Sequence, residues 1–203
     1  MSLAVGDGRL IAIVDAVTGR AVGASGHHLV CQPGCSPCCF GPFAITQLDA
    51  WRLQEGLREL GKWKSAQVAA VRQRAGEAVS EQAVWFPHDR VGIFLDETDE
   101  SGFHSRFSGA PCPALDPETG SCLLYSWRPI VCRTHGPPLS LSGQSYPPCP
   151  LCFRGATTAE LEKARVQLNV DASEEALTRT AERKTGRHGM TTVAFAIAGF
   201  SDR

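Results

Sequence analysis

The sequence has almost no net charge and no long apolar run. Its 20 lysines and arginines are balanced by 21 aspartates and glutamates, which gives a net charge of −1 and a pI of about 6.6. Such a chain lacks the basic surface that nucleic acids and anionic membranes attract. No stretch is apolar for long enough to span a bilayer. We therefore expect no nucleic-acid partner and no membrane association.

The first residues also lack the basic start of a secretory signal peptide. Their apolar run is interrupted by Asp15 and Gly19, so we expect no signal peptide and a cytoplasmic location. In that reducing compartment, clustered cysteines hold metal or do redox work more often than they form disulfides.

Several catalytic patterns are missing as well. We find no Ser/His/Asp constellation and no glycine loop for phosphate. At the level of the fold, the sequence shows no internal repeat and no alternation of strands with helices. The acidic run at residues 96–100 is predicted to be a solvated loop, not an acid/base pair. Hydrolytic chemistry without a metal is therefore unsupported, and whether the protein is an enzyme stays open.

The chain is long enough to fold without disulfides. With 203 residues and 43% apolar content, it can bury an ordinary core as one domain over residues 1–203. Helical spacing and capping residues predict helices at residues 47–61, from residue 65 onward, at 156–168 and at 171–184. Residues 9–26 favour a helix, and residues 190–200 alternate like a strand. We predict a mainly α fold whose helices flank an irregular, cysteine-rich middle segment, residues 85–156, with a C-terminal segment at 157–203.

Cysteine is the residue that the chain has in abundance. The chain has nine cysteines, and four of them lie in the stretch CQPGCSPCCFGPF at residues 31–43. Short CxxC and CxxxC spacings let a turn aim two sulfurs at one point, as zinc and iron–sulfur sites require. We predict that the thiols bind metal, as two four-ligand sites with one thiol to spare or as a single site. The candidate ligands are Cys31, Cys35, Cys38, Cys39, Cys112, Cys122, Cys132, Cys149 and Cys152.

The individual cysteines differ in their context. Cys149-Pro-Leu-Cys152 is an ordinary metal knuckle. Cys38 and Cys39 are adjacent, and neighbouring side chains diverge in extended chain, so they would serve two metals or one would face the core. His135 is a possible nitrogen ligand, although a lone histidine more often packs or faces solvent.

Two parts of the sequence together resemble the YkgJ family, a zinc- or iron-chelating domain named for its CxxCxxCC motif. The first is the clustered stretch at residues 31–39, in which the first gap holds three residues instead of two. The second is CPALDPETGSCLLYSWRPIVCRTHG at residues 112–136. The resemblance covers about residues 31–153 and implies metal binding. Some relatives carry the domain in enzymes that methylate flagellin lysines.

An alternative follows from the three-residue gap. Cys31, Cys35 and Cys38 have the CxxxCxxC spacing of radical S-adenosylmethionine enzymes, but Pro37 stands where those enzymes usually carry an aromatic residue. Two hypotheses stay open. In one, an iron–sulfur cluster or zinc orders the chain and the protein serves an unknown protein partner or client. In the other, the protein is an iron–sulfur enzyme or accessory protein for redox, methyl-transfer or radical chemistry.

Overall fold

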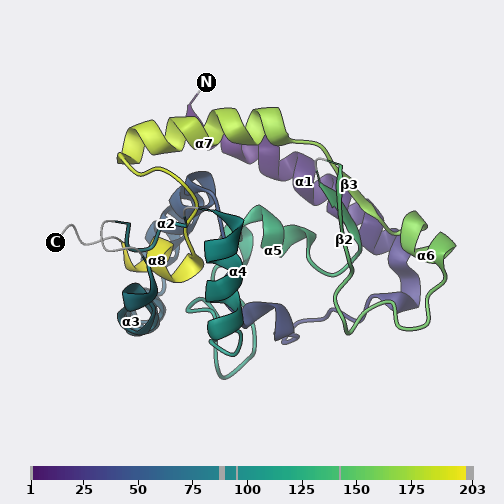
Figure 1. Cartoon of the computed structure of the whole chain (residues 1–203), viewed down its shortest axis with the longest axis horizontal. Helices are drawn as coiled ribbons and strands as arrows, with labels where there is room; N and C mark the ends of the chain where they lie inside the picture. The colour runs from purple at the N-terminus through teal and green to yellow at the C-terminus, as the bar shows by residue number, and fades with distance from the viewer. Residues whose placement is uncertain (1, 87–89, 95, 142, 200–203) are drawn as a thin grey trace. The chain divides into compact units, whose positions relative to one another are not determined.

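A computed structural model describes residues 2–86, 90–94, 96–141 and 143–199 of the chain (Figure 1). It divides into two compact units, which are described separately. Unit 1 comprises Met1–Pro33 and Ile130–Thr180, and unit 2 comprises Gly34–Pro129 and Ala181–Arg203. The prediction of a single domain over residues 1–203 stays a prediction.

Helices dominate the described residues, as the sequence predicts. The α-helices are α1 (Leu3–Ser25), α2 (Gln47–Gly61), α3 (Ser65–Gln82), α4 (Glu97–Arg106), α5 (Ile130–Thr134), α6 (Thr158–Lys163), α7 (Asp171–Thr185) and α8 (Val193–Ala198). Single 3-10 turns are η1 (Gly26–His28), η2 (Pro37–Cys39), η3 (Ala83–Trp85) and η4 (Tyr125–Trp127). The strands are β1 (Leu139–Leu141), β2 (Gln144–Tyr146) and β3 (Val166–Leu168).

The core of unit 2 is built by α2, α3 and α8, which pack against one another (Figure 1). The predicted helices at 47–61 and from 65 are both confirmed. Thr46 caps α2 by accepting the backbone N–H of Asp49, and the predicted apolar face of α3 buries Val71 and Ala75. Caps and helical spacing decide these elements because they satisfy end groups and direct one face inward.

The strand predicted at residues 190–200 is wrong, because Val193–Ala198 is helical. Thr192 caps this short helix by accepting the N–H of Phe195, and Gly199 follows it at φ 70°. The five residues from Val193 to Ile197 are all buried. A helix covered on every side has no polar face, so its sequence lacks the spacing that identifies a helix.

Unit 1 is organised along α1, against which α5, α6 and β3 pack (Figure 1). The predicted N-terminal helix is confirmed, and its buried side includes Leu10, Val14 and Ala21. The three strands form one sheet in the order β2-β1-β3, in which β1 pairs antiparallel with β2 and parallel with β3.

The helix predicted at residues 156–168 is shorter than expected. Thr157 and Glu160 form the predicted capping box, but α6 ends at Lys163 and the chain continues as β3. In β3, Val166 and Leu168 are buried on the same side of the strand, which is the period-two pattern of a sheet. The predicted helix at 171–184 is confirmed as α7.

The middle segment is less irregular than predicted. The acidic run expected to be a loop contains the start of α4: the Asp96 side chain accepts the N–H groups of Thr98 and Asp99. Aspartate is a favoured N-cap, and acidic residues in a first turn interact well with the helix dipole. The cysteines of this segment lie outside α4.

Candidate metal centre

All nine cysteines lie in the described part of the chain, where none forms a disulfide, and each unit contains several of them. Unit 2 carries Cys35, Cys38, Cys39, Cys112 and Cys122. Unit 1 carries Cys31, Cys132, Cys149 and Cys152. Each unit therefore has at least the four thiols that one tetrahedral metal site requires.

The adjacent pair in unit 2 does not diverge as the sequence suggested. Cys38 and Cys39 lie in η2, a 3-10 turn that begins with Pro37, and their thiols are close enough for each to shift the pKa of the other. The expectation of divergence assumed extended backbone, whereas a tight helical turn rotates successive side chains much less than a strand does.

A short antiparallel contact brings Cys112 next to this pair. The Cys112 N–H donates to the Cys39 carbonyl at 2.7 Å, and the Gly41 N–H donates to the Ala110 carbonyl at 2.8 Å. From α3, the Arg74 Nε–H donates to the Pro113 carbonyl at 3.0 Å. The segment that carries Cys112 is thus fixed on two sides.

Cys122 comes close to the other cysteines of unit 2 because the turn before it packs through Gly120 against Gly34 of the cysteine loop. A turn stabilised by the Asp116 side chain precedes an isolated bridge between Leu115 and Cys122. Gly120 in this turn has φ 67°, and a Cβ there would lie 2.7 Å from the carbonyl oxygen of Gly34. Only glycine lets the turn approach the cysteine loop this closely.

The thiols of unit 2 differ in their pKa values. A hydrogen bond from Cys39 lowers the pKa of Cys38 to about 6, and the same bond raises the pKa of Cys39. Burial raises the pKa of Cys112 to about 12 and also raises that of Cys122. The positive charge of Arg128 lowers the pKa of both Cys38 and Cys122.

Arg128 was not recognised from the sequence as a site residue. Its guanidinium lies over the Tyr125 ring, 3.5 Å from the ring centre, and its Nε–H donates to the Tyr125 carbonyl at 3.0 Å. In the sequence, the Arg-Pro pair before Cys132 is only one part of the longer motif at residues 112–136. A cation beside several thiolates offsets their mutual repulsion, so Arg128 belongs to the electrostatics of the unit 2 group.

In unit 1, the predicted knuckle forms a compact turn. The Cys152 N–H donates to the Cys149 carbonyl at 2.8 Å, and the backbone of Leu151 and Cys152 acts to lower the pKa of the Cys149 thiol. Burial nevertheless raises the pKa of Cys149. Phe153, which follows, has φ 55° and packs with both cysteines in a small apolar cluster.

Cys31 joins this knuckle from the N-terminal segment. Its sulfur lies 3.9 Å from that of Cys152. The approach is fixed by two backbone hydrogen bonds, from the Phe153 N–H to the His28 carbonyl at 2.8 Å and from the Cys149 N–H to the Gly136 carbonyl at 3.0 Å. Three distant segments therefore meet at these thiols.

Cys132 is the fourth thiol of unit 1 and lies half-buried on α5. The next residue, Arg133, forms an ion pair with Asp15 of α1 at 2.9 Å, which holds α5 on α1. His135 lies just beyond α5, and its side chain is exposed. In the described residues, the imidazole does not join the thiols in a group of three or more metal-binding side chains, and its ligand role stays a prediction.

The chemistry of both groups fits a thiolate-bound metal. Backbone groups act to lower the pKa of Cys112, Cys122 and Cys149, and backbone N–H donors stabilise a thiolate in this way. In the described residues, the thiols meet in pairs, and no three His, Cys, Asp or Glu side chains converge as a complete metal site.

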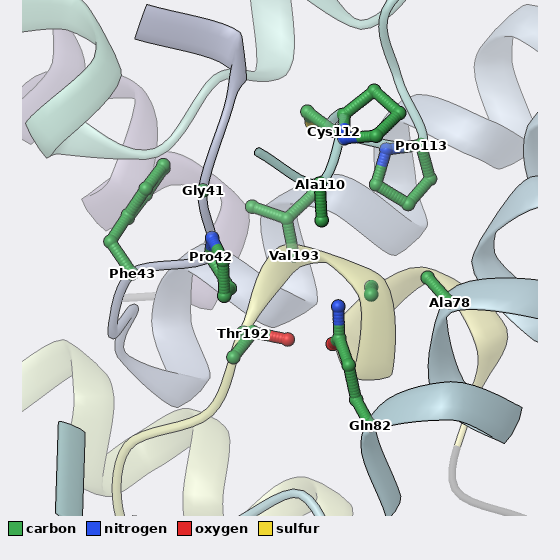
Figure 2. A pocket seen from close by; sticks show the side chains of 12 residues that line it. Gly41, Pro42, Phe43, Ala78, Gln82, Ala110, Cys112, Pro113, Thr192 and Val193 are labelled. Atoms are coloured by element: carbon green, nitrogen blue, oxygen red, sulfur yellow. The ribbon is translucent and has the colours of Figure 1, made fainter. Parts of the chain in front are cut away.

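A small cavity lies behind Cys112 in unit 2 (Figure 2). It has a volume of about 20 Å³, which is room for about one water molecule. Thr192 and Gln82 contribute polar groups to its lining, and the buried Gln82 Oε1 has no hydrogen-bond partner among the described residues. The cavity suits a water and is too small for an organic substrate.

These thiol groups define a candidate cysteine-based metal centre, and comparison with known families agrees. The family model described as "CxxCxxCC: Putative zinc- or iron-chelating domain" matches residues 30–153. The chain belongs to this family, which confirms the resemblance to YkgJ proteins and indicates zinc or iron chelation. No curated protein and no solved structure matches the chain. In the described part, no helix has both the length and the apolarity to cross a membrane.

The cap of α6, next to the knuckle of unit 1, provides a pH-dependent test of this region. Glu160 accepts the N–H and the hydroxyl of Thr157 at 2.8 and 2.7 Å, and its Oε1 lies 3.2 Å from His28 Nε2. These bonds, led by the Thr157 N–H, lower the pKa of Glu160 to about 2.

A lowered carboxyl pKa contributes stability above the ordinary value, and that stability is lost as the pH falls through the folded value. We expect Glu160→Gln to destabilise the protein at neutral pH. The difference from wild type should shrink between pH 4.5 and about 2, the ordinary and folded values. Denaturation of both proteins across this range measures it, and a pH-independent difference would contradict the assignment.

Proposed function

We propose that this protein binds one metal ion in each unit, through thiolates, and that the ions order the irregular chain around them. In unit 2 the ligands are Cys38, Cys39, Cys112 and Cys122, with Cys35 as the ninth thiol. In unit 1 they are Cys31, Cys132, Cys149 and Cys152. The observation that carries the proposal is the 3.9 Å separation of the Cys31 and Cys152 sulfurs. Backbone N–H groups that favour the thiolate forms of Cys112 and Cys149 support it.

The sulfur separation in unit 1 favours a single ion over a four-iron cluster. Two thiolates at about 2.3 Å from one tetrahedral ion stand about 3.8 Å apart, and Cys31 and Cys152 are 3.9 Å apart. In a four-iron cluster each thiolate binds a different iron, which places the sulfurs farther apart. Zinc and single iron both satisfy this geometry.

A site closed by four sulfurs has no open position for a substrate, so the ions stabilise structure and do not catalyse. We extend the proposal to a cytoplasmic protein that serves a protein partner, since reducing conditions keep the thiols available. The alternative hypothesis is an iron–sulfur centre that supports redox, methyl-transfer or radical chemistry.

Anaerobic purification followed by metal analysis and an absorption spectrum of one sample tests the proposal. We expect about two ions per chain and no acid-labile sulfide. A brown protein with several irons and sulfide per chain would overturn single-ion binding and direct attention to iron–sulfur chemistry.

Cysteine variants test whether each unit holds its own ion. Cys122→Ser and Cys149→Ser should each remove about one of the two ions, because serine replaces a thiolate ligand in one unit only. His135→Ala, which changes an exposed side chain, serves as the control and should retain both ions. Loss of all metal from either cysteine variant would indicate one shared site, and metal loss from His135→Ala would make His135 a ligand.

A further inference from the structure

Cys31 and Cys152 combine close contact with opposite exposure. Their sulfurs are 3.9 Å apart although 121 residues separate them in the sequence. Cys152 is only 4% exposed, whereas Cys31 is exposed on a stretch without helix or strand between η1 and Pro33. Cys31 is therefore the member of the pair that a reagent in solution meets first, whereas Cys152 is buried.

We infer that Cys31 and Cys152 are a site of oxidative modification, at which exchange with a small-molecule disulfide such as glutathione disulfide joins the two sulfurs. The inference rests on the proposed function for its consequence, which is release of the ion bound in unit 1. The pair then acts as a redox-sensitive control of metal binding in that unit.

The chemistry runs in two exchanges. The Cys31 thiolate attacks one sulfur of glutathione disulfide, forms a mixed disulfide and expels one glutathione thiolate. The Cys152 thiolate then attacks the Cys31 sulfur and expels the second glutathione. The two protein sulfurs lose two electrons, the glutathione disulfide gains them, and the glutathione thiolates take up the protons that the cysteines give up.

The geometry requires only local movement. A disulfide brings the sulfurs to about 2.05 Å, so the pair must close by rotating its side chains. Cys31 is the member that can move, because no regular element contains it. Cys152 is held by the knuckle, where its N–H bonds the Cys149 carbonyl.

Oxidation removes two of the four thiolates that the proposed function assigns to the ion. A disulfide sulfur carries no negative charge and is a poor ligand, and two thiolates alone do not hold a tetrahedral ion well. The metal is therefore released as the disulfide forms, and reduction restores the site.

Cys149 is the competing partner, because it also contacts Cys152. It is buried, at 7% exposure, so it does not meet the reagent first. The exchange is consequently initiated at Cys31, and a Cys149–Cys152 disulfide is not the first product.

The experiment uses the full chain with its metal as purified. The protein is incubated with glutathione disulfide, metal release is followed with a chromogenic chelator, and disulfides are mapped by mass spectrometry after alkylation. We expect a Cys31–Cys152 disulfide to form as about half of the metal is released. Cys31→Ser should slow oxidation of Cys152 by about tenfold or more, since the accessible thiolate is the attacking group.

Cys35→Ser is the matched control, because it removes a half-buried thiol in the same loop and should leave the Cys31–Cys152 disulfide unchanged. A first product that joins other cysteines, or no disulfide under these conditions, would overturn the inference. If the purified chain holds no metal but the Cys31–Cys152 disulfide still forms, the proposed function fails while the modification site stands.

Discussion

Gly56→Ala is expected to destabilise unit 2 by about 1–3 kcal/mol, the usual cost of forcing extra volume into a packed core. Gly56 lies within α2, and a Cβ at this position would stand 2.6 Å from Cγ of Trp127 and 2.7 Å from its Cβ. Real contacts are never this short, so the Trp127 side chain or the helix must move. In an open helix position the same change would instead stabilise by about 0.5–1 kcal/mol.

The strain falls on a segment beside the candidate metal centre of unit 2. Trp127 is part of η4, between Cys122 and Arg128, and packs on the core of unit 2. Displacing it moves the chain that holds both residues. We therefore expect Gly56→Ala to weaken metal retention in unit 2 as well as to lower the denaturant midpoint.

Gly76→Ala is the matched control. Gly76 lies inside α3, and nothing stands within 4 Å of a Cβ built there. This substitution should raise stability by about 0.5–1 kcal/mol, because alanine loses less backbone entropy in a helix. Chemical denaturation of both variants checks the pair. Equal effects of the same sign would show that the contact between Gly56 and Trp127 does not govern the packing.

The helices that could be predicted carry their signals within a few residues. Thr46 bonds Asp49 at the start of α2, and Thr157 with Glu160 marks the start of α6. These are local contacts that depend on residue type and spacing alone. The Thr192 cap of α8 is equally local, but the apolar sequence after it lacks a polar face and its alternation suggested a strand.

The site shows the same division between local and distant information. Residue type and clustering sufficed to nominate all nine cysteines. Which sulfurs meet is decided by contacts across the sequence, such as Gly34 against Gly120 and Cys31 against Cys152. Arg128 could not be predicted for a related reason. Its charge influences Cys38 and Cys122 only because folding brings these cysteines, which are distant from each other in the sequence, close to it.

Metal removal is expected to have the largest effect of all. The binding free energy of structural zinc in small domains is about 10–16 kcal/mol, and it is folding energy where the site does not form without the ion. Short backbone contacts connect Cys39 to Cys112 and Leu115 to Cys122, and Ala114 and Leu124 pack into the core. Without metal, these contacts must oppose the entropy of the loops without the binding energy of the ion.

Trypsin cleavage can measure the loss of order after metal removal, because arginines lie both in the cysteine-rich chain and in the packed helix α3. After a strong chelator has removed the metal under reducing conditions, we expect rapid cleavage after Arg106 and Arg154, which lie in or beside the cysteine-rich chain. Arg72 and Arg74, inside α3, should stay protected, since that helix packs through Val71 and Ala75 on the core of unit 2.

Reversal identifies the ion as the cause. Adding zinc back should restore protection, whereas magnesium, which prefers oxygen ligands, should not. If the metal-free chain resists trypsin as well as the metal-bound chain, the ions do not order the middle segment. The thiol groups would then have to be explained by their chemistry instead of by their contribution to folding.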